Sequence, residues 1–197
     1  MPKLKLKNCV HGKGVFTEEK IYAGELILQF DGPVVHADRL PRPYSAENDY
    51  YLQIGPEIFL GPSDDLDDFV NHSCDPNSGV IISSGVIGLV SITPISPGSE
   101  ITFDYSTTMD NFWWEMSCAC GSKKCRQKVQ NFVDLAVEIK QRYVQLGIVP
   151  DYILQKLTKC QIEKPSEPFY KTGSISLLDH MIFEKILFNR NNSILSS

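Results

Sequence analysis

The segments FVNHSCDPN, Phe69 to Asn77, and GSEITFDY, Gly98 to Tyr105, contain the most distinctive residue patterns of this chain. Asn71 followed by His72 is by itself typical of an Asx turn with a capping histidine. Tyr105 is by itself typical of a tyrosine that ends a short strand and covers the edge of a core. Neither segment points to chemistry alone, so the interpretation of both depends on what surrounds them.

A third segment, CACGSKKCR, places Cys118, Cys120 and Cys125 in a Cys-x-Cys-x4-Cys spacing. Disulfides within so short a stretch would be strained, because bridged cysteines need Cα separations of about 4.4–6.8 Å and suitable Cβ directions. Thiolates around one metal ion suit the spacing better, although three unconnected reduced cysteines remain the alternative. A closed zinc site takes four ligands, and spacing alone does not choose the fourth. The remaining cysteines are Cys9, Cys74 and Cys160.

Residues 1–110 predict short strands separated by turns, with no long βαβ pattern and no internal repeat. LKLK alternates between apolar and charged residues, and ELILQFDGPVV is a β-rich apolar run. HGKGVF and TEEKIYAG predict a turn-rich connector between these two strand regions, because both contain glycine. Residues 36–49 predict an irregular insert, and residues 80–95 predict a hairpin with Ser84 and Gly85 at its turn.

The pattern then changes to helical periodicity. Apolar residues from Val129 to Tyr143 predict a helix that is closed by Gly147, and residues 151–157 predict a second short helix. Residues 163–169, with two prolines, predict a linker. Residues 176–189 predict an amphipathic helix that packs on the body or, alternatively, offers an apolar stripe to a partner.

The composition is that of an ordinary globular protein of about one domain, with 42% hydrophobic and 22% charged residues. No apolar run approaches the roughly 18 residues of a membrane span, and the N-terminus shows no apolar core of a secretory signal. Collagen, coiled coil, wholesale disorder and membrane proteins are therefore excluded. The net charge of −5 and the pI of about 5.4 also argue against a strongly basic nucleic-acid binder.

The charge is uneven along the sequence. Residues 1–110 hold 7 Lys and Arg against 16 Asp and Glu, a net of −9, whereas residues 111–197 hold 12 against 8, a net of +4. An acidic front half favours a basic partner or substrate, and a merely solvated acidic surface explains it equally well.

Together and in this order, GKG at 12–14, FVNHSCDPN, GSEITFDY and CACGSKKCR closely resemble the SET-domain protein lysine methyltransferases that carry a post-SET zinc motif. The resemblance covers residues 5–130. It implies a mainly β fold of several short curled sheets with a C-terminal pseudoknot, followed by an α-helical C-terminal segment. The implied division is a SET domain at 1–110, a post-SET zinc segment at 111–130 and a helical C-terminal extension at 131–197.

The reaction implied by this resemblance is transfer of a methyl group from S-adenosylmethionine to a lysine amine. The amine must be neutral to attack, and at an ordinary lysine pKa of about 10.4 this costs roughly 4–5 kcal/mol at neutral pH. The positive cofactor and an apolar channel both lower that pKa. Holding the two reactants in line is then the main catalytic resource.

The resemblance also implies a residue for each role. Tyr105 matches the catalytic tyrosine, which orients the amine and stabilises charge around the methyl group. The residues implied to bind S-adenosylmethionine are Gly12, Lys13, Gly14, Asn71, His72 and Tyr105. The residues implied to hold structural Zn²⁺ are Cys74, Cys118, Cys120 and Cys125. The aromatic residues expected along the lysine channel, each with core packing as its alternative, are Phe30, Tyr50, Tyr51, Phe103, Trp113 and Trp114.

The implied substrate is a basic lysine-containing protein segment, such as a histone tail. In many family members a phenylalanine at the position of Phe103 is associated with di- or trimethylation of the lysine. A catalytically inactive SET-fold module for protein interaction is the alternative, and methylation of a small molecule or an N-terminal amine is a third hypothesis. The expected location is a reducing intracellular compartment, cytoplasmic or nuclear, or a secreted effector if the source is bacterial. Neither membrane nor direct nucleic-acid binding is expected, and the oligomeric state is open.

Overall fold

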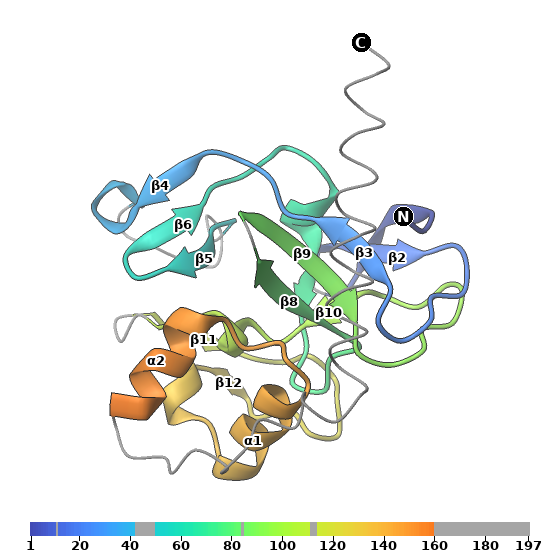
Figure 1. Cartoon of the computed structure of the whole chain (residues 1–197). Coiled ribbons are helices and arrows are strands. Elements are labelled where there is room, and N and C mark those ends of the chain that lie inside the picture. The colour runs from blue at the N-terminus through green and yellow to red at the C-terminus, as the bar shows by residue number, and fades with distance from the viewer. Residues whose placement is uncertain (11, 42–49, 84, 111–113, 160–197) are drawn as a thin grey trace. The chain divides into compact units, whose positions relative to one another are not determined.

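A computed structural model describes residues 1–10, 12–41, 50–83, 85–110 and 114–159 (Figure 1). The linker expected at 163–169 and the helix expected at 176–189 lie outside these residues. In the described ranges no helix has the length and apolar character needed to cross a bilayer.

The described elements are mostly short strands. The strands are β1 (Leu4–Cys9), β2 (Gly12–Thr17), β3 (Leu26–Gln29), β4 (Val34–His36), β5 (Leu52–Gly55), β6 (Ile58–Leu60), β7 (Asn71–His72), β8 (Ser78–Ser83), β9 (Val86–Ser91), β10 (Thr102–Phe103), β11 (Met116–Ser117) and β12 (Lys128–Val129). The helices are α1 (Val137–Gln145) and α2 (Asp151–Lys159), with short 3₁₀ turns at Ala37–Arg39, Leu66–Phe69, Tyr105–Thr107 and Phe132–Asp134. This confirms the mainly β prediction.

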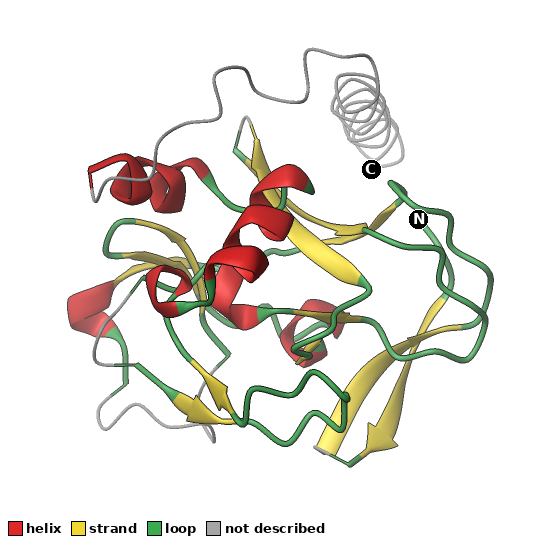
Figure 2. Ribbon diagram, turned by 90° about the horizontal axis from the view of Figure 1, so that it is seen from below, coloured by secondary structure: helices red, strands yellow, loops and turns green. Residues whose placement is uncertain are grey.

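The strands form small separate sheets rather than one large one. The orders are β1-β2, β3-β9-β8, β4-β6-β5, β10-β7 and β11-β12. The predicted hairpin is confirmed as β8 and β9, whose register runs from Ser78 opposite Ser91 to Ser83 opposite Val86. Figure 1 shows α1, α2, β11 and β12 gathered on one side of β8 and β9, and Figure 2 shows how much loop joins the strands.

An apolar core lies where the sheets meet. Its fully or nearly fully buried members come from strands and from the turns that follow them. They are Val15, Ile21, Ile27, Leu28, Val70, Val80, Leu89, Ile95, Ile101 and Phe103. Most are β-branched or aromatic residues, which pack well on a pleated surface and account for the β structure here.

Two segments far apart in sequence run side by side in parallel. Strand β10 pairs with β7 in parallel, with Phe103 opposite His72. The backbone N–H of Ser73 donates to the carbonyl of Phe103 at 3.0 Å, and the Asn77 side chain donates to the carbonyl of Glu100 at 2.7 Å. The pairing brings the segment that ends in Tyr105 beside residues 71–74, here called the NHSC loop.

The prediction of a turn-rich connector at HGKGVF was wrong. Gly12–Thr17 is strand β2 and pairs antiparallel with β1 along its whole length, from Cys9 opposite Gly12 to Leu4 opposite Thr17. Its glycines indicated a turn, but backbone pairing with the alternating β1 strand outweighs that local preference.

The prediction of one helix from Val129 to Tyr143 was too long at its start. Val129 belongs to β12 and lies opposite Met116, and α1 begins only at Val137. Val129 in β12 and Phe132 in the following 3₁₀ turn are both fully buried. Their spacing in the sequence is therefore the same as that of buried residues on one face of a helix, although they belong to different elements. The end was predicted correctly, because Gly147 follows α1 in the left-handed conformation with φ of +68°. The second predicted helix is α2.

Candidate active site and metal cluster

Tyr105 is held at both its backbone and its hydroxyl. It lies just past the parallel pairing of β7 and β10, and its backbone N–H donates to Nδ1 of His72 at 3.2 Å. Its hydroxyl donates to the carbonyl of Val70 at 2.8 Å. The ring centroids of His72 and Phe103 lie 5.3 Å and 4.8 Å from its own. The tyrosine therefore has one defined orientation.

Tyr105 forms part of the wall of a pocket with a cavity volume of about 60 Å³ that opens to solvent. Five of the six aromatic residues expected along a substrate channel line the same pocket, although they come from four separate stretches of chain. They are Phe30, Tyr50, Tyr51, Phe103 and Trp114. Trp113 lies outside the described residues. Core packing does not account for Tyr50, whose side chain is 46% exposed.

The pocket also has an acidic side that sequence reasoning did not identify residue by residue. Asp31, Asp67 and Asp68 line it together with the aromatic residues. Asp67 accepts a hydrogen bond from the backbone of Asp31 at 3.0 Å, and Asp68 accepts from the backbone of Ser63 at 3.0 Å. Among the described residues no lysine or arginine forms an ion pair with these three carboxylates. The acidic run DDLDDF at residues 64–69 was the sequence feature from which this acidic side of the pocket could have been predicted.

The predicted cofactor residues gather at the start of β2, beside the NHSC loop. The Asn71 amide donates to the carbonyl of Lys13 at 2.9 Å and to Oε1 of Glu100 at 2.7 Å. A Cβ at position 14 would overlap that carboxylate oxygen and lie 2.8 Å from Nδ2 of Asn71. Gly14 thus lets an amide and a carboxylate stand directly against bare backbone, while Gly12 has a positive φ of +99° that favours glycine.

The groups gathered here, a carboxylate, an amide and a backbone carbonyl, have the chemistry that a polar, positively charged cofactor needs. A Cβ at Gly14 would overlap the Glu100 carboxylate, so only glycine fits against these groups. Glu100 is half-buried there and was not predicted as a site residue. Its signal was present in the sequence, as the acidic residue of GSEITFDY.

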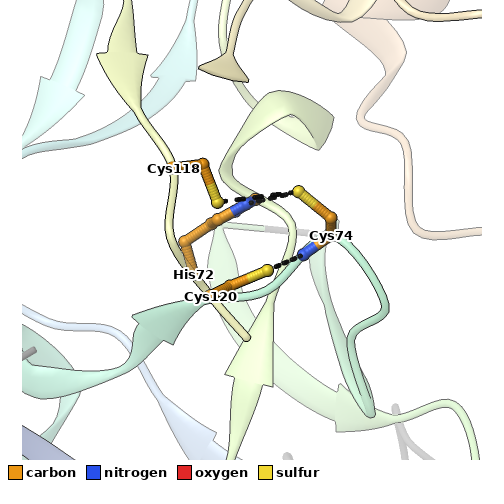
Figure 3. A group of neighbouring side chains, drawn as sticks. All are labelled: His72, Cys74, Cys118 and Cys120. Carbon is orange, nitrogen blue, oxygen red and sulfur yellow. Dashed lines mark hydrogen bonds between the residues drawn. The ribbon is translucent and has the colours of Figure 1, made fainter. Parts of the chain in front are cut away.

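Three of the cysteines meet beside His72 (Figure 3), and Tyr105 packs against their cluster. Ligand atoms of His72, Cys74, Cys118 and Cys120 all lie within 4.8 Å of one another. The Sγ atom of Cys118 lies 3.7 Å from Sγ of Cys74 and also 3.7 Å from Sγ of Cys125. Four sulfurs at the usual zinc distance of about 2.3 Å form a tetrahedron with edges of about 3.8 Å. Both Sγ–Sγ distances from Cys118 match the edge of such a tetrahedron.

The surroundings of these sulfurs also suit thiolates. Backbone N–H groups donate to the sulfurs, from Arg126 to Cys74 at 3.4 Å and from Cys74 to Cys120 at 3.5 Å. Among the three candidates for a fourth ligand, Cys74 joins the cluster. Cys9 lies instead beside the Asn71 amide, and Cys160 is outside the described residues.

The thiol pKa values show why such a cluster needs a cation. Burial raises the pKa of Cys74 to about 11 and raises that of Cys118 further still. Burial acts the same way on Cys120, but hydrogen bonds from the backbone of Cys74 and Ser122 outweigh it and lower its pKa to about 7. Several adjacent thiolates repel one another, and a bound divalent ion removes that penalty.

His72 links the metal cluster to Tyr105. Its Nδ1 accepts the Tyr105 backbone N–H, and its Nε2 lies 3.2 Å from Sγ of Cys74. Nδ1 also lies 3.5 Å from Oδ1 of Asp104. The four possible ligands that the structure groups are thus His72, Cys74, Cys118 and Cys120, while the predicted ligand Cys125 lies beside them with its Sγ 3.7 Å from that of Cys118.

The model of one protein family, described as the SET domain, matches residues 12–106. The match begins at the glycine that opens β2 and ends one residue after Tyr105. The chain carries a SET domain. Both segments around Tyr105 and the β2 strand fall inside it, whereas the three-cysteine segment and the two α-helices follow it.

Relatives in sequence are histone-lysine methyltransferases. The chain is 30% identical over 137 residues to the human protein Histone-lysine N-methyltransferase 2B, a match that covers 61% of this chain and 5% of that protein. It is 29% identical over 130 residues to the Arabidopsis thaliana Histone-lysine N-methyltransferase ASHH3, covering 60% of this chain and 35% of that protein. The chain thus corresponds to a small part of these relatives.

Solved structures share the fold of the SET domain. The KRYPTONITE protein in complex with mCHH DNA, an H3(1–15) peptide and SAH aligns with a TM-score of 0.54 and 25% identity, covering 66% of this chain and 30% of that one. The methyltransferase domain of human SETMAR aligns with a TM-score of 0.57 and 22% identity, covering 66% and 59%. The likeness to SETMAR shows the fold alone.

Proposed function

We propose that this SET domain transfers a methyl group from S-adenosylmethionine to a lysine side chain of a basic protein segment of the histone-tail type. The observation that carries the proposal is the pocket in which Tyr105 meets aromatic walls and an acidic side. Histone-lysine methyltransferases among the relatives, and a neighbour with bound H3 peptide and SAH, support it.

The pocket suits a lysine side chain at both of its ends. Aromatic rings such as Phe103 and Trp114 contact the methylene stem and attract the charged amine before it loses its proton. Asp31, Asp67 and Asp68 attract basic residues near the pocket. An apolar wall lowers the pKa of the amine and reduces the roughly 4–5 kcal/mol needed to neutralise it at pH 7.

Tyr105 is the residue that acts on the amine. Its hydroxyl is fixed against the Val70 carbonyl, and both residues line the pocket. In this position the hydroxyl oxygen orients the amine, and the fixed dipoles of the hydroxyl and the carbonyl stabilise charge near the reacting atoms. No separate general base is assigned.

The cofactor and the metal each have a distinct set of residues. Gly12, Lys13, Gly14, Asn71 and His72 would hold S-adenosylmethionine, which supplies an activated methyl group when bound. The residues that would hold a structural zinc ion are Cys74, Cys118, Cys120 and Cys125. Zinc would fix the segment that contributes Trp114 to the pocket, so metal binding and formation of the pocket would be coupled.

The remaining features of the proposal follow the sequence. We propose a SET domain at 1–110, a zinc segment at 111–130 and a helical extension at 131–197. Phe103, buried and 4.8 Å from Tyr105 between ring centroids, favours di- or trimethylation. The free thiols of the described cysteines agree with a reducing cytoplasmic or nuclear location.

The test is methyl transfer from labelled S-adenosylmethionine to core histones, comparing the wild type with Tyr105→Phe. We expect label on a histone band with the wild type and a loss of at least about 100-fold with Tyr105→Phe, because an orienting and charge-stabilising group is removed. Mass spectrometry of the band gives the site and the number of methyl groups.

The matched control is Tyr22→Phe, which removes the hydroxyl of a tyrosine that is 58% exposed and should leave transfer unchanged. Calorimetric titration of S-adenosylmethionine into both variants separates binding from chemistry. A wild type that binds neither cofactor nor peptide would refute the proposal and favour the inactive interaction module. Label on free lysine or N-terminal amines instead of histones would favour the third hypothesis.

A further inference from the structure

A buried carboxylate directly precedes Tyr105. Asp104 is fully buried, and both its oxygens accept hydrogen bonds from the guanidinium of Arg126, at 2.7 Å and 2.8 Å. The backbone N–H of Ser106 donates to it at 3.1 Å. The hydroxyl of Tyr143, from α1, donates to it at 2.8 Å. The helical extension therefore reaches the residue next to Tyr105 through a single hydroxyl.

A second tyrosine makes the same kind of contact from α2. The Tyr152 hydroxyl lies 2.9 Å from the carbonyl of Gln53 and 2.5 Å from the carbonyl of Thr108. Thr108 lines the pocket three residues after Tyr105, and Gln53 directly follows Leu52, which also lines it. The Gln53 side chain accepts the Asp110 backbone N–H at 2.9 Å. Tyr152 thus lies behind two pocket walls that come from distant parts of the chain.

These hydroxyls have little to do with filling space. Tyr143 is 1% exposed, and a phenylalanine would pack equally well around its ring. What phenylalanine would remove is one donor from Asp104 and one donor from the Thr108 carbonyl. Asp104 would keep Arg126 and Ser106, so its charge would stay paired while one of its directional restraints was lost.

We propose that Tyr143 and Tyr152 are positioning residues through which the two helices hold the segment 104–110. Tyr143 fixes Asp104 and, through it, the orientation of Tyr105. Tyr152 fixes the separation of the pocket walls at Gln53 and Thr108. The effect on catalysis rests on the proposed methyl transfer, whereas the effect on the segment does not. Small errors in such positions are costly when reacting atoms must be aligned.

The two contacts predict two different kinetic effects. With core histones as substrate, Tyr143→Phe should lower kcat about tenfold and leave KM within about twofold, because Tyr105 loses alignment. Tyr152→Phe should raise KM about fivefold with a smaller change in kcat, because the pocket walls separate. Tyr22→Phe is the matched control and should change neither constant.

Amide hydrogen exchange tests the same contacts without any activity. The backbone N–H of Thr107 donates to the Asp104 carbonyl, and that of Thr108 donates to the Tyr105 carbonyl. Exchange of the amides at 106–108 should accelerate about tenfold in Tyr143→Phe, while amides of β8 and β9 keep their protection. Melting temperatures recorded in parallel show whether any change is merely global.

The outcomes separate the two proposals. If the wild type neither binds cofactor nor transfers methyl groups, the proposed function fails and the exchange data alone decide on the positioning role. If exchange and both kinetic constants match the wild type in both variants, the positioning role is overturned. It is also overturned if the melting temperature falls while the kinetic constants and the exchange at 106–108 do not change relative to β8 and β9.

Discussion

Tyr105 packs against two clusters of buried residues that differ in their residue types. One lies in the body formed by β1 to β10 and consists of ten buried residues, all aliphatic except Phe103. The other consists of Cys74, Met109, Trp114, Cys118 and Val129, with Cys120 and Cys125 packed against it. The body can fold by burying apolar surface, whereas thiols dominate the second cluster.

The difference extends to residues 114–159, here called the tail. Phe132 and Ile148 are buried there, and Met109 of the segment 104–110 packs with Trp114 and Val129 of the tail. Polar side chains add directional contacts between the tail and that segment, through Arg126, Tyr143 and Tyr152. Polar contacts add little net stability but strongly constrain geometry. The comparison therefore teaches that the body is held together by its apolar core, whereas the tail sets the arrangement around Tyr105 through polar contacts and the sulfur cluster.

Of all the changes predicted here, removal of the metal should produce the largest difference between the tail and the body. We expect Cys118→Ser, or a strong zinc chelator, to abolish zinc binding and methyl transfer, because structural zinc in small sites contributes on the order of 10 kcal/mol to folding. Metal analysis and amide exchange measure the result. Exchange should become fast at β11 and β12 and stay slow at β8 and β9.

The control for this change is Cys9→Ser, since Cys9 lies outside the sulfur cluster beside Asn71. It should retain zinc in full. If chelation exposed β8 and β9 as well, body and tail would be one cooperative unit and the comparison would be wrong.

Gly79→Ala should have a smaller effect, because it acts where the two regions pack directly. A Cβ on Gly79, in β8, would overlap Cγ2 of Ile148 and lie 2.6 Å from its Cβ. Ile148 follows α1 and is almost fully buried, so it has little room to move. We expect a loss of about 1–3 kcal/mol in the free energy of unfolding, measured by denaturant titration, with zinc content unchanged.

Gly55→Ala is the matched control, because its added Cβ would meet Ile58 at an ordinary 3.6 Å. It also lies in a strand and should cost clearly less. Equal stability of the two variants would mean that the tail moves freely away from β8.

The sequence predicted most of the local features and few of the long-range ones. GKG, NHSC, FDY and the cysteines are short motifs, and the structure brings them to one place. Asp104 and Arg126 belong to the same motifs, but their pairing joins residues 22 positions apart and leaves no local signal. Tyr143 was predicted only as a buried position of a helix. Apolar periodicity predicts which residues are buried, but it does not predict which group a tyrosine hydroxyl contacts. The β2 strand was not predicted, because its strand conformation depends on pairing with β1.

The smallest expected effect is a pH dependence that belongs to the tail. Burial raises the pKa of Tyr143 and that of Tyr152, with further contributions from the nearby carboxylates of Asp104 and Asp110. Tyrosines in the unfolded chain ionise at about pH 10, while the buried ones stay protonated, so their contribution to stability is complete below that pH and falls above it.

Between about pH 10 and 11 each of these tyrosines should therefore reduce the free energy of unfolding by about 1 kcal/mol per pH unit. Calorimetry of the wild type and of Tyr143→Phe/Tyr152→Phe measures the difference, because lysines and exposed tyrosines titrate equally in both. The double variant should lose stability more slowly with rising pH, and Tyr22→Phe should follow the wild type. Identical slopes for all three would mean that the tail hydroxyls ionise in the folded protein and are not buried against the segment 104–110.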